Sequence, residues 1–345
     1  MNTSLETLIE SERENGRFPS LSVAVTRRST LLHAKAYGLA NLEHSVPATP
    51  HTVYRIGSLT KTFTAAAVML LVEHGKVQLA DSIRKYLPDL SFTWDTITLR
   101  HLLAHTSGVP SYEPLAIDTW RQNDTYEKLI QAVAERPLCF QPGEAWGYDN
   151  TNYVVLGLVI ERVSGKRYAA FLEESFFAPL GMVDTRCNDY AALVPNRAQG
   201  YVYSPDEQPC LENRENPHPQ ILWNYADGGM LSTAVDLAIW DSALSAGTVL
   251  TRTSIDQMWT PARLNDGRAI EYGIGWILKG SGGQRTIGHW GRIPGFTAEM
   301  TRFPADERTV VVLSNRWTSG AHAELEEIVK RIAGFSFHGR RSVNV

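Results

Sequence analysis

The sequence has few cysteines, no long apolar run and no cluster of basic residues, and each absence excludes a class of protein. The three cysteines among 345 residues, Cys139, Cys187 and Cys210, are widely spaced and form no C-x-x-C pair. This pattern favours reduced, partly buried thiols over a disulfide framework or a zinc site. The 33 basic and 37 acidic residues are interspersed and give a formal charge of −4. Nucleic-acid binding, which needs a concentrated positive surface, is therefore disfavoured.

Signals for a membrane or for export are missing as well. The longest uncharged apolar stretch, residues 65–72, is far shorter than the roughly 18 to 20 residues that cross a bilayer. The first ten residues have neither a basic start nor the apolar run of a secretory signal. We therefore expect a soluble, cytoplasmic protein with no membrane partner.

Two familiar hydrolase signatures are also absent. The chain contains neither G-x-S-x-G, typical of α/β-hydrolases, nor H-E-x-x-H, typical of zinc peptidases. No cluster of His, Cys, Asp and Glu has the spacing of metal ligands. We expect no metal and no cofactor.

What the sequence does contain is a regular succession of strand and helix patterns. Amphipathic or apolar helical periodicity predicts helices over residues 4–14, 60–73 and 321–333. Alternating or β-rich patterns predict strands over residues 21–26, 31–37, 273–278, 286–290, 297–303 and 309–314. Because strands lie near both chain ends, the predicted fold class is α+β, with one antiparallel sheet flanked by helices and built from both ends.

The middle of the chain is read as an insertion. It is rich in Pro, Asn, Asp and Trp and has several helical segments. We expect a sheet domain formed by residues 1–80 and 235–345, and a mainly helical inserted domain over residues 81–234. The active site is expected at the interface between the two.

Ser58 and Lys61 form an S-x-x-K pair at the start of a predicted helix. A helix start supplies free N–H groups and partial positive charge, which stabilise an oxyanion, and a lysine three residues later lies on the same face. That lysine can act as a base only if burial lowers its pKa from about 10.4 by about three units. A second pair, Ser82 and Lys85, lies in a charged segment that could not desolvate an amine. Taken alone, the first motif also fits a serine at a helix start with an unrelated surface lysine.

A Y-x-N pattern, Tyr148 and Asn150, comes just before an apolar helix predicted over residues 154–163. The phenol can share a proton with Ser58 and Lys61. The amide can bond both the lysine and a substrate carbonyl, which would hold them in line. By itself the pattern is an ordinary turn.

A third pattern, His289, Trp290, Gly291 and Arg292, lies on a predicted strand. Gly291 is expected to leave room for a substrate backbone, and the N–H of Arg292 to face that of Ser58 in an oxyanion hole. Trp290 would narrow the cleft or give an apolar wall for acyl or aryl groups. A single histidine in a strand is more often structural than functional.

In this order, S-x-x-K, Y-x-N and H-x-G resemble the three-part signature of the serine penicillin-recognising enzymes, which include penicillin-binding proteins, class C β-lactamases and class VIII esterases. The framing segments that also resemble this family are residues 53–58, 102–108, 227–233 and 272–276. The resemblance covers nearly the whole chain and implies a β-lactamase/transpeptidase-like fold.

The resemblance also implies roles for individual residues. Ser58 would be the acylated nucleophile, and Lys61 and Tyr148 the general base and acid. Asn150 would position them, and residues 289–292 would form the substrate-facing strand.

Two departures from the family pattern bear on the substrate. His289 stands where class C β-lactamases have the lysine of Lys-Thr-Gly, as in the H-x-G of some DD-carboxypeptidases and D-aminopeptidases, so efficient β-lactam turnover is not expected. Asp149 stands where many relatives have serine and alters the charge around Lys61.

We therefore expect a serine hydrolase acting on small carboxylic esters or on D-amino-acid-type amides and peptides. The alternatives are a DD-carboxypeptidase or β-lactamase, and a catalytically silent relative that binds acyl or peptide ligands. The sequence leaves the oligomeric state open.

Overall fold

A seven-stranded antiparallel sheet forms the centre of the computed structural model, which describes residues 4–90, 92–115, 125–189, 191–203, 209–211, 225–318 and 320–335. Its strand order is β3-β2-β1-β12-β11-β10-β9. β1 (Ser20–Arg27) pairs with β12 (Arg308–Ser314), so segments from the two ends of the chain meet in the middle of the sheet. The predicted fold class is confirmed.

The remaining strands of this sheet are β2 (Thr30–Asn41), β3 (Val46–Pro47), β9 (Ile277–Lys279), β10 (Thr286–Ile293) and β11 (Phe296–Phe303). Two small sheets contain β4 (Tyr54–Arg55), β8 (Met230–Ser232) and β5 (Arg186–Cys187), and β13 (Arg316–Trp317), β6 (Tyr201–Tyr203) and β7 (Pro209–Leu211). The strand predicted over residues 273–278 is mostly wrong, because only its end enters β9. Gly275 has a φ of +78°, outside the range of an extended strand, and lies so close to helix α2 (Thr60–Glu73) that a Cβ on it would be 2.4 Å from Ala65 Cβ.

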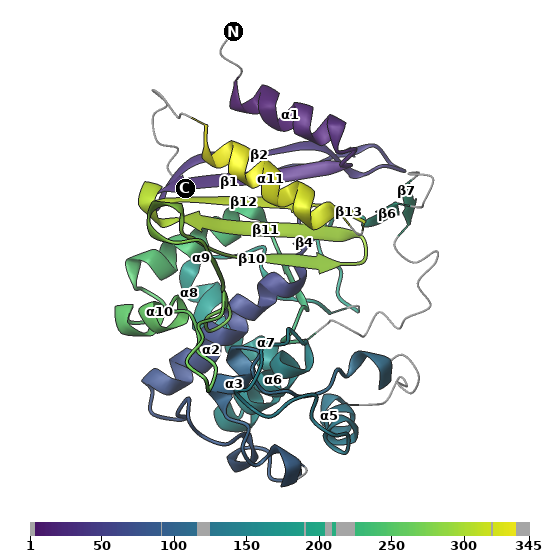
Figure 1. The fold of residues 1–345 in the computed structure, drawn as a ribbon. Helices are drawn as coiled ribbons and strands as arrows, with labels where there is room; N and C mark the ends of the chain where they lie inside the picture. Colours follow the sequence, from purple (N-terminus) through teal and green to yellow (C-terminus); the bar gives the residue numbers. More distant parts are fainter. Residues whose placement is uncertain are drawn as a thin grey trace.

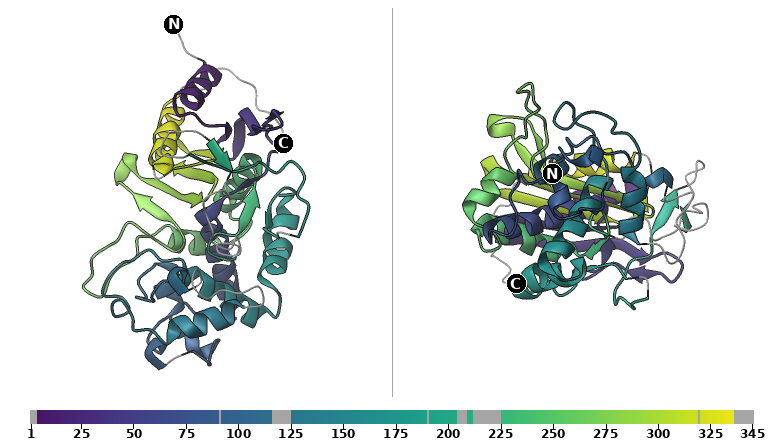
Figure 2. Two further views of the ribbon diagram at one scale, coloured as in Figure 1. Left: turned by 90° about the vertical axis from the view of Figure 1, so that its right-hand side faces the viewer. Right: turned by 90° about the horizontal axis from the view of Figure 1, so that it is seen from below.

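Helices cover both faces of the sheet, as Figures 1 and 2 show. α1 (Leu5–Asn15) and α11 (Ala321–Ala333) lie on one face, and α9 (Ala234–Ala246) lies on the other. The alternation along β12 explains this arrangement. Val310 and Val312 are buried in the cluster that contains the apolar side of α11, whereas Val311 and Leu313 belong to the core on the opposite face.

The other helices gather mostly beneath the sheet in Figure 1. They are α2 (Thr60–Glu73), α3 (Leu99–Leu103), α5 (Tyr126–Ala134), α6 (Thr151–Ser164), α7 (Tyr168–Leu172), α8 (Ala178–Leu180) and α10 (Arg252–Met258). α2 is buried nearly all round, including the threonines and the lysine of its first two turns, and ends before Gly75 (φ +66°). Phe63 of α2 stacks on Trp240 of α9 with ring centroids 4.2 Å apart, so one core joins the helices to the sheet.

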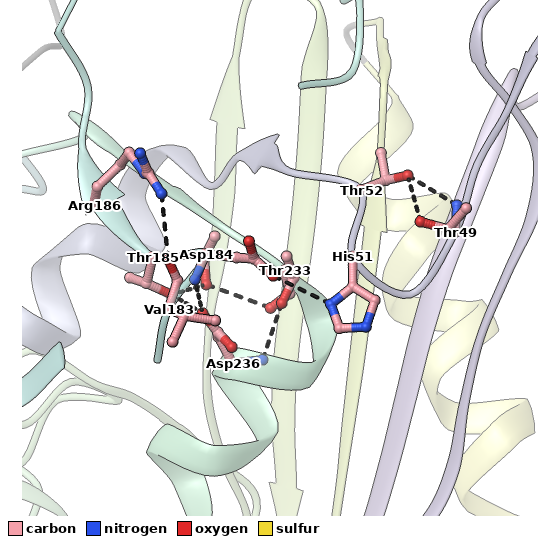
Figure 3. A network of polar contacts seen from close by, with 10 residues as sticks. Thr49, His51, Thr52, Val183, Asp184, Thr185, Arg186, Thr233 and Asp236 are labelled. Carbon is pink, nitrogen blue, oxygen red and sulfur yellow. Dashed lines mark hydrogen bonds and ion pairs between the residues drawn. The ribbon is translucent and has the colours of Figure 1, made fainter. Parts of the chain in front are cut away.

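A polar network next to α9 fixes the segment that leads toward Ser58 (Figure 3). The Asp236 carboxylate accepts hydrogen bonds from Asp184 N at 3.0 Å and Thr185 Oγ1 at 2.8 Å. Thr233 caps the helix by accepting from Asp236 N, and His51 Nδ1 lies 3.2 Å from Asp184 Oδ2. The network thus joins α9, the loop before β5 and the loop before β4.

The cysteines follow the expectation in part. Cys187 is half-buried and Cys139 is exposed, and neither forms a disulfide. Cys139 therefore corrects the expectation of partly buried thiols, and the side chain of Cys210 lies outside the described residues. Within the described part of the chain, no helix is both long and apolar enough to span a bilayer.

Candidate active site

Ser58 lies in a short 3₁₀ turn, η1 (Gly57–Leu59), that leads directly into α2. Its side chain faces a cavity, and the residue is 8% exposed. The predicted position at a helix start is confirmed. Ser82, the serine of the second S-x-x-K pair, instead caps another 3₁₀ turn by accepting from Arg84 N, and Lys85 pairs with Asp81 at the surface.

Lys61 is fully buried and lies within hydrogen-bond distance of three oxygen atoms. Its Nζ is 3.0 Å from Ser58 Oγ, 2.7 Å from Asn150 Oδ1 and 2.6 Å from the Asp227 carbonyl oxygen. Burial lowers the pKa of Lys61 to about 8, although the negative charges of Asp227, Asp149 and Glu113 act in the opposite direction. About a tenth of the amine is then neutral at pH 7 and able to accept the Ser58 proton.

Tyr148 also lies next to the lysine, with its ring centroid 5.0 Å from Lys61 Nζ. Burial raises the pKa of the phenol above its usual value, with Ser58 opposing the rise. No well-formed hydrogen bond engages the buried Tyr148 Oη among the residues that the structure describes. The phenol is therefore protonated at neutral pH, and its proton is available to a reacting group.

Gly291 has a different role from the one expected. A Cβ on this residue would lie 1.8 Å from the Ile56 carbonyl oxygen, so the space beside it is filled by the chain that leads into the turn carrying Ser58 and not by a substrate backbone. Because β10 approaches the turn so closely, Arg292 N lies only 2.9 Å from the position that a Cβ on Gly57 would occupy. Gly57 has a φ of +51°, and both glycines are needed for this contact.

His289 lies behind the cavity rather than in its lining. It is 1% exposed, its Nδ1 donates to the Trp290 carbonyl oxygen at 2.6 Å, and its Nε2 accepts from Tyr272 Oη at 3.0 Å. Burial lowers the pKa of His289 to about 3, so the ring is neutral. In this arrangement the His289 ring lies 6.2 Å from the Tyr148 ring and is not among the residues that line the cavity, so it does not face substrate as expected.

Trp290 does line the cavity. Its ring stacks on Tyr148 at 5.7 Å and contacts His322 of α11 at 4.8 Å. The exposed Arg292 guanidinium lies 5.9 Å from the centroid of the Trp290 ring. The ring therefore forms an apolar wall beside the phenol.

The cavity in front of Ser58 has a volume of about 400 Å³. Its lining residues are Gly57, Ser58, Ser111, Glu113, Tyr148, Asp149, Asn150, Asp227, Gly228, Trp290, Arg292, Ile293, Pro294 and Trp317. Glu113 Oε1 accepts from Asn150 Nδ2 at 2.8 Å and so orients the amide whose oxygen binds Lys61.

Sequence reasoning missed Glu113 and the direct contact of Asp227 with Lys61. Asp227 could have been proposed as a site residue, because it begins one of the framing segments that resemble the family. Glu113 lies in no recognisable pattern.

A larger cavity of about 660 Å³ is lined by residues that include Asp241, Trp259 and Arg302. It has no lysine or histidine beside its serines, so we assign the reactive site to the cavity at Ser58. In the part of the chain that the structure describes, no three His, Cys, Asp or Glu residues are grouped to hold a metal ion.

Comparison with known proteins gives consistent matches over nearly the whole chain. The family model described as Beta-lactamase matches residues 5–334. Penicillin-binding protein 4* of Bacillus subtilis (strain 168) is 32% identical over 329 residues, which cover 92% of this chain and 71% of that protein. Protein flp of Staphylococcus aureus (strain COL) is 26% identical over 317 residues, 90% of this chain but 62% of that relative, so this chain spans less than two thirds of its length.

Solved structures are similar over the same extent. The octameric penicillin-binding protein homologue from Pyrococcus abyssi has a TM-score of 0.80 and 30% identity, covering 94% of this chain and 75% of that one. D-amino acid amidase from Ochrobactrum anthropi SV3, in complex with L-phenylalanine, has a TM-score of 0.80 and 26% identity. The match covers 96% of this chain and 98% of the amidase chain. A D-stereospecific amidohydrolase from Streptomyces sp. has a TM-score of 0.75 and 25% identity. The match covers 94% of this chain and 97% of the amidohydrolase chain.

Proposed function

Because this chain belongs to the Beta-lactamase family and is a serine hydrolase of that family, we propose that it cleaves D-amino-acid-type amides and small carboxylic esters through an acyl-enzyme on Ser58. One observation carries the proposal. The buried amine of Lys61 lies 3.0 Å from Ser58 Oγ and has a pKa lowered to about 8, which places a potential base next to a potential serine nucleophile.

In the proposed reaction, neutral Lys61 takes the Ser58 proton while Ser58 Oγ bonds to the substrate carbonyl carbon. The N–H groups of Ser58 and Arg292 would stabilise the oxyanion, a contribution of about 3 kcal/mol per donor in comparable enzymes. The phenol of Tyr148 protonates the leaving amine or alcohol as its bond to carbon breaks, and it regains a proton from the Lys61 ammonium. Water then adds to the acyl group by the same route, and the Ser58 ester bond breaks.

The charge of the cavity supports an amino-acid amide as substrate. Glu113, Asp149 and Asp227 line it, whereas Arg292 carries the one positive side chain among the lining residues that are described. Carboxylates favour a substrate with a free ammonium group over one that presents a carboxylate, as a β-lactam does. The similarity to D-amino acid amidase and to the D-stereospecific amidohydrolase points to the same class.

The first test is covalent labelling with a fluorophosphonate. We expect Ser58→Ala to abolish the label and Ser82→Ala to leave it unchanged, because the Ser82 hydroxyl caps a turn and has no buried amine beside it. Mass spectrometry locates the labelled peptide. Label that persists on Ser58→Ala would overturn the assignment, and an unlabelled wild type that still binds substrate would favour the silent acyl-binding alternative.

The second test is a substrate panel of D- and L-alanine p-nitroanilide, p-nitrophenyl butyrate, a D-Ala-D-Ala peptide and nitrocefin. We expect turnover of the D-anilide and the butyrate, and a much lower kcat/KM for nitrocefin, because the Trp290 ring narrows the approach of water to a bulky acyl group. Trp290→Thr should reduce that difference. DD-carboxypeptidase activity is the second candidate, favoured by the match to penicillin-binding protein 4*, and faster turnover of the peptide would select it.

A further inference from the structure

The residues on both sides of Tyr148 are held by one residue from a distant segment, His105. Gly147 N donates to the His105 carbonyl oxygen at 3.0 Å, and Asp149 N donates to His105 Nδ1 at 3.3 Å. The imidazole also contacts the phenol ring itself, with centroids 4.4 Å apart and planes 35° apart. His105 therefore holds the backbone N–H groups of the residues before and after Tyr148 and contacts the face of its ring.

His105 is itself firmly held. It is 0% exposed and has a φ of +58°, a left-handed conformation that residues other than glycine rarely adopt and that persists only where the surroundings enforce it. The rings of Tyr153 and Tyr272 lie 5.1 and 4.9 Å from the imidazole. A residue this constrained can transmit its own position to the loop that it contacts.

The hydrogen bonds also define the state of the imidazole. Asp149 N–H points at Nδ1, and the side-chain amide of Asn152 lies 3.3 Å from the same nitrogen, so the proton of the neutral ring is on Nε2. Burial lowers the pKa of His105 well below its usual value, and the positive charge of Lys61 adds to this effect. Nδ1 thus remains an acceptor throughout the neutral range.

We propose that His105 is a positioning residue for the phenol of Tyr148, acting through its carbonyl oxygen on Gly147 N–H, through Nδ1 on Asp149 N–H and through its ring on the aromatic face. The inference rests on the proposed function, in which Tyr148 transfers a proton. His105 is not among the residues lining the cavity, so its loss should slow the chemical steps and leave substrate binding nearly unchanged.

Two substitutions separate the contributions of the ring and the acceptor. His105→Phe keeps an aromatic ring and loses the acceptor, whereas His105→Asn places an oxygen near the position of Nδ1 and tolerates a positive φ. With D-alanine p-nitroanilide, whose amine leaving group must be protonated as it departs, we expect kcat to fall about 10- to 100-fold in His105→Phe and less than about 10-fold in His105→Asn, with KM within about 2-fold of the wild type. His33→Asn, which removes a buried imidazole from β2, is the control and should leave kcat unchanged.

A double-mutant cycle with Tyr148→Phe distinguishes positioning from general damage. Once the phenol hydroxyl is gone, adding His105→Phe should lower kcat by no more than about 2-fold, because the group that it positions no longer acts. An undiminished loss in that background, or a wild-type kcat in His105→Phe, would overturn the inference. If thermal unfolding shows that His105→Phe does not fold, the same cycle with His105→Asn decides. Activity retained by Ser58→Ala would instead overturn the proposed function, so the two failures are distinguishable.

Discussion

Lys61 takes its chemical character from burial more than from its charged neighbours. Asp227, Asp149 and Glu113 favour the ammonium form, yet desolvation is the larger effect and leaves the pKa near 8 instead of 10.5. A neutral amine is needed to accept the proton of Ser58. Below the pKa, the neutral fraction therefore rises about tenfold for each pH unit.

We predict that kcat/KM for p-nitrophenyl butyrate rises about tenfold between pH 6 and 7 and levels off above about pH 8, because protonation of Lys61 removes the base at lower pH. Asp149→Asn should move the midpoint to lower pH, since it removes a negative charge that favours the ammonium. Initial rates, corrected with Ser58→Ala for uncatalysed hydrolysis, give the profile. Activity that falls between pH 6 and 8 would contradict the role of Lys61.

At the scale of elements, the site depends on the contact between β10 and η1. Strand and turn approach so closely because Gly291 has no side chain opposite the Ile56 carbonyl oxygen, and because Gly57 adopts a left-handed φ. The contact places the Arg292 backbone beside Gly57, the residue before Ser58. The glycine of the H-x-G motif therefore allows the strand to pack against the turn that carries the serine of the S-x-x-K motif.

We predict that Gly291→Ala lowers kcat/KM at least about 100-fold and also lowers the melting temperature, because the new methyl group would push the strand away from the nucleophile turn. Gly283→Ala is the matched control, since nothing lies within 4 Å of a Cβ there. Steady-state kinetics and differential scanning calorimetry measure both effects. A Gly291→Ala protein with normal kinetics would show that this contact does not determine the site.

At the scale of the whole molecule, stability depends on how the sheet is joined to the helices beneath it. Besides the shared apolar core, Arg302 of β11 pairs with Asp241 of α9 at 2.7 Å, with side chains only 14% and 5% exposed. The guanidinium also lies 4.8 Å from the Trp259 ring centroid. Both side chains are therefore largely buried, although they border the larger cavity.

We predict that Arg302→Met destabilises the protein by about 3 to 5 kcal/mol, because it leaves the buried Asp241 carboxylate without its partner. Arg252→Met, in a pair whose arginine side chain is 65% exposed, should change stability far less. Urea unfolding followed by circular dichroism gives both values. Equal effects of the two substitutions would refute the role assigned to the buried pair.

Local patterns allowed much of the fold and half of the site to be predicted. The apolar run over residues 60–73 is helix α2 with the same ends, and three-residue spacing alone places Lys61 on the same face as Ser58. The alternation of apolar and polar residues predicted most strands to within a few residues. The presence of strands near both chain ends predicted the antiparallel sheet. The division at residues 80 and 234 and the cytoplasmic location remain predictions.

The sequence by itself therefore singled out Ser58 as the proposed nucleophile, Lys61 as its proposed base and the elements that carry them, because helix and strand periodicity is a local property of neighbouring residues. Only the tertiary structure decided what surrounds them. It brought Glu113 to Asn150, turned His289 behind the cavity and filled the space at Gly291 with the Ile56 carbonyl. Burial, which sets the pKa of Lys61, and contacts between distant segments arise from packing of the whole chain, and no local pattern encodes them.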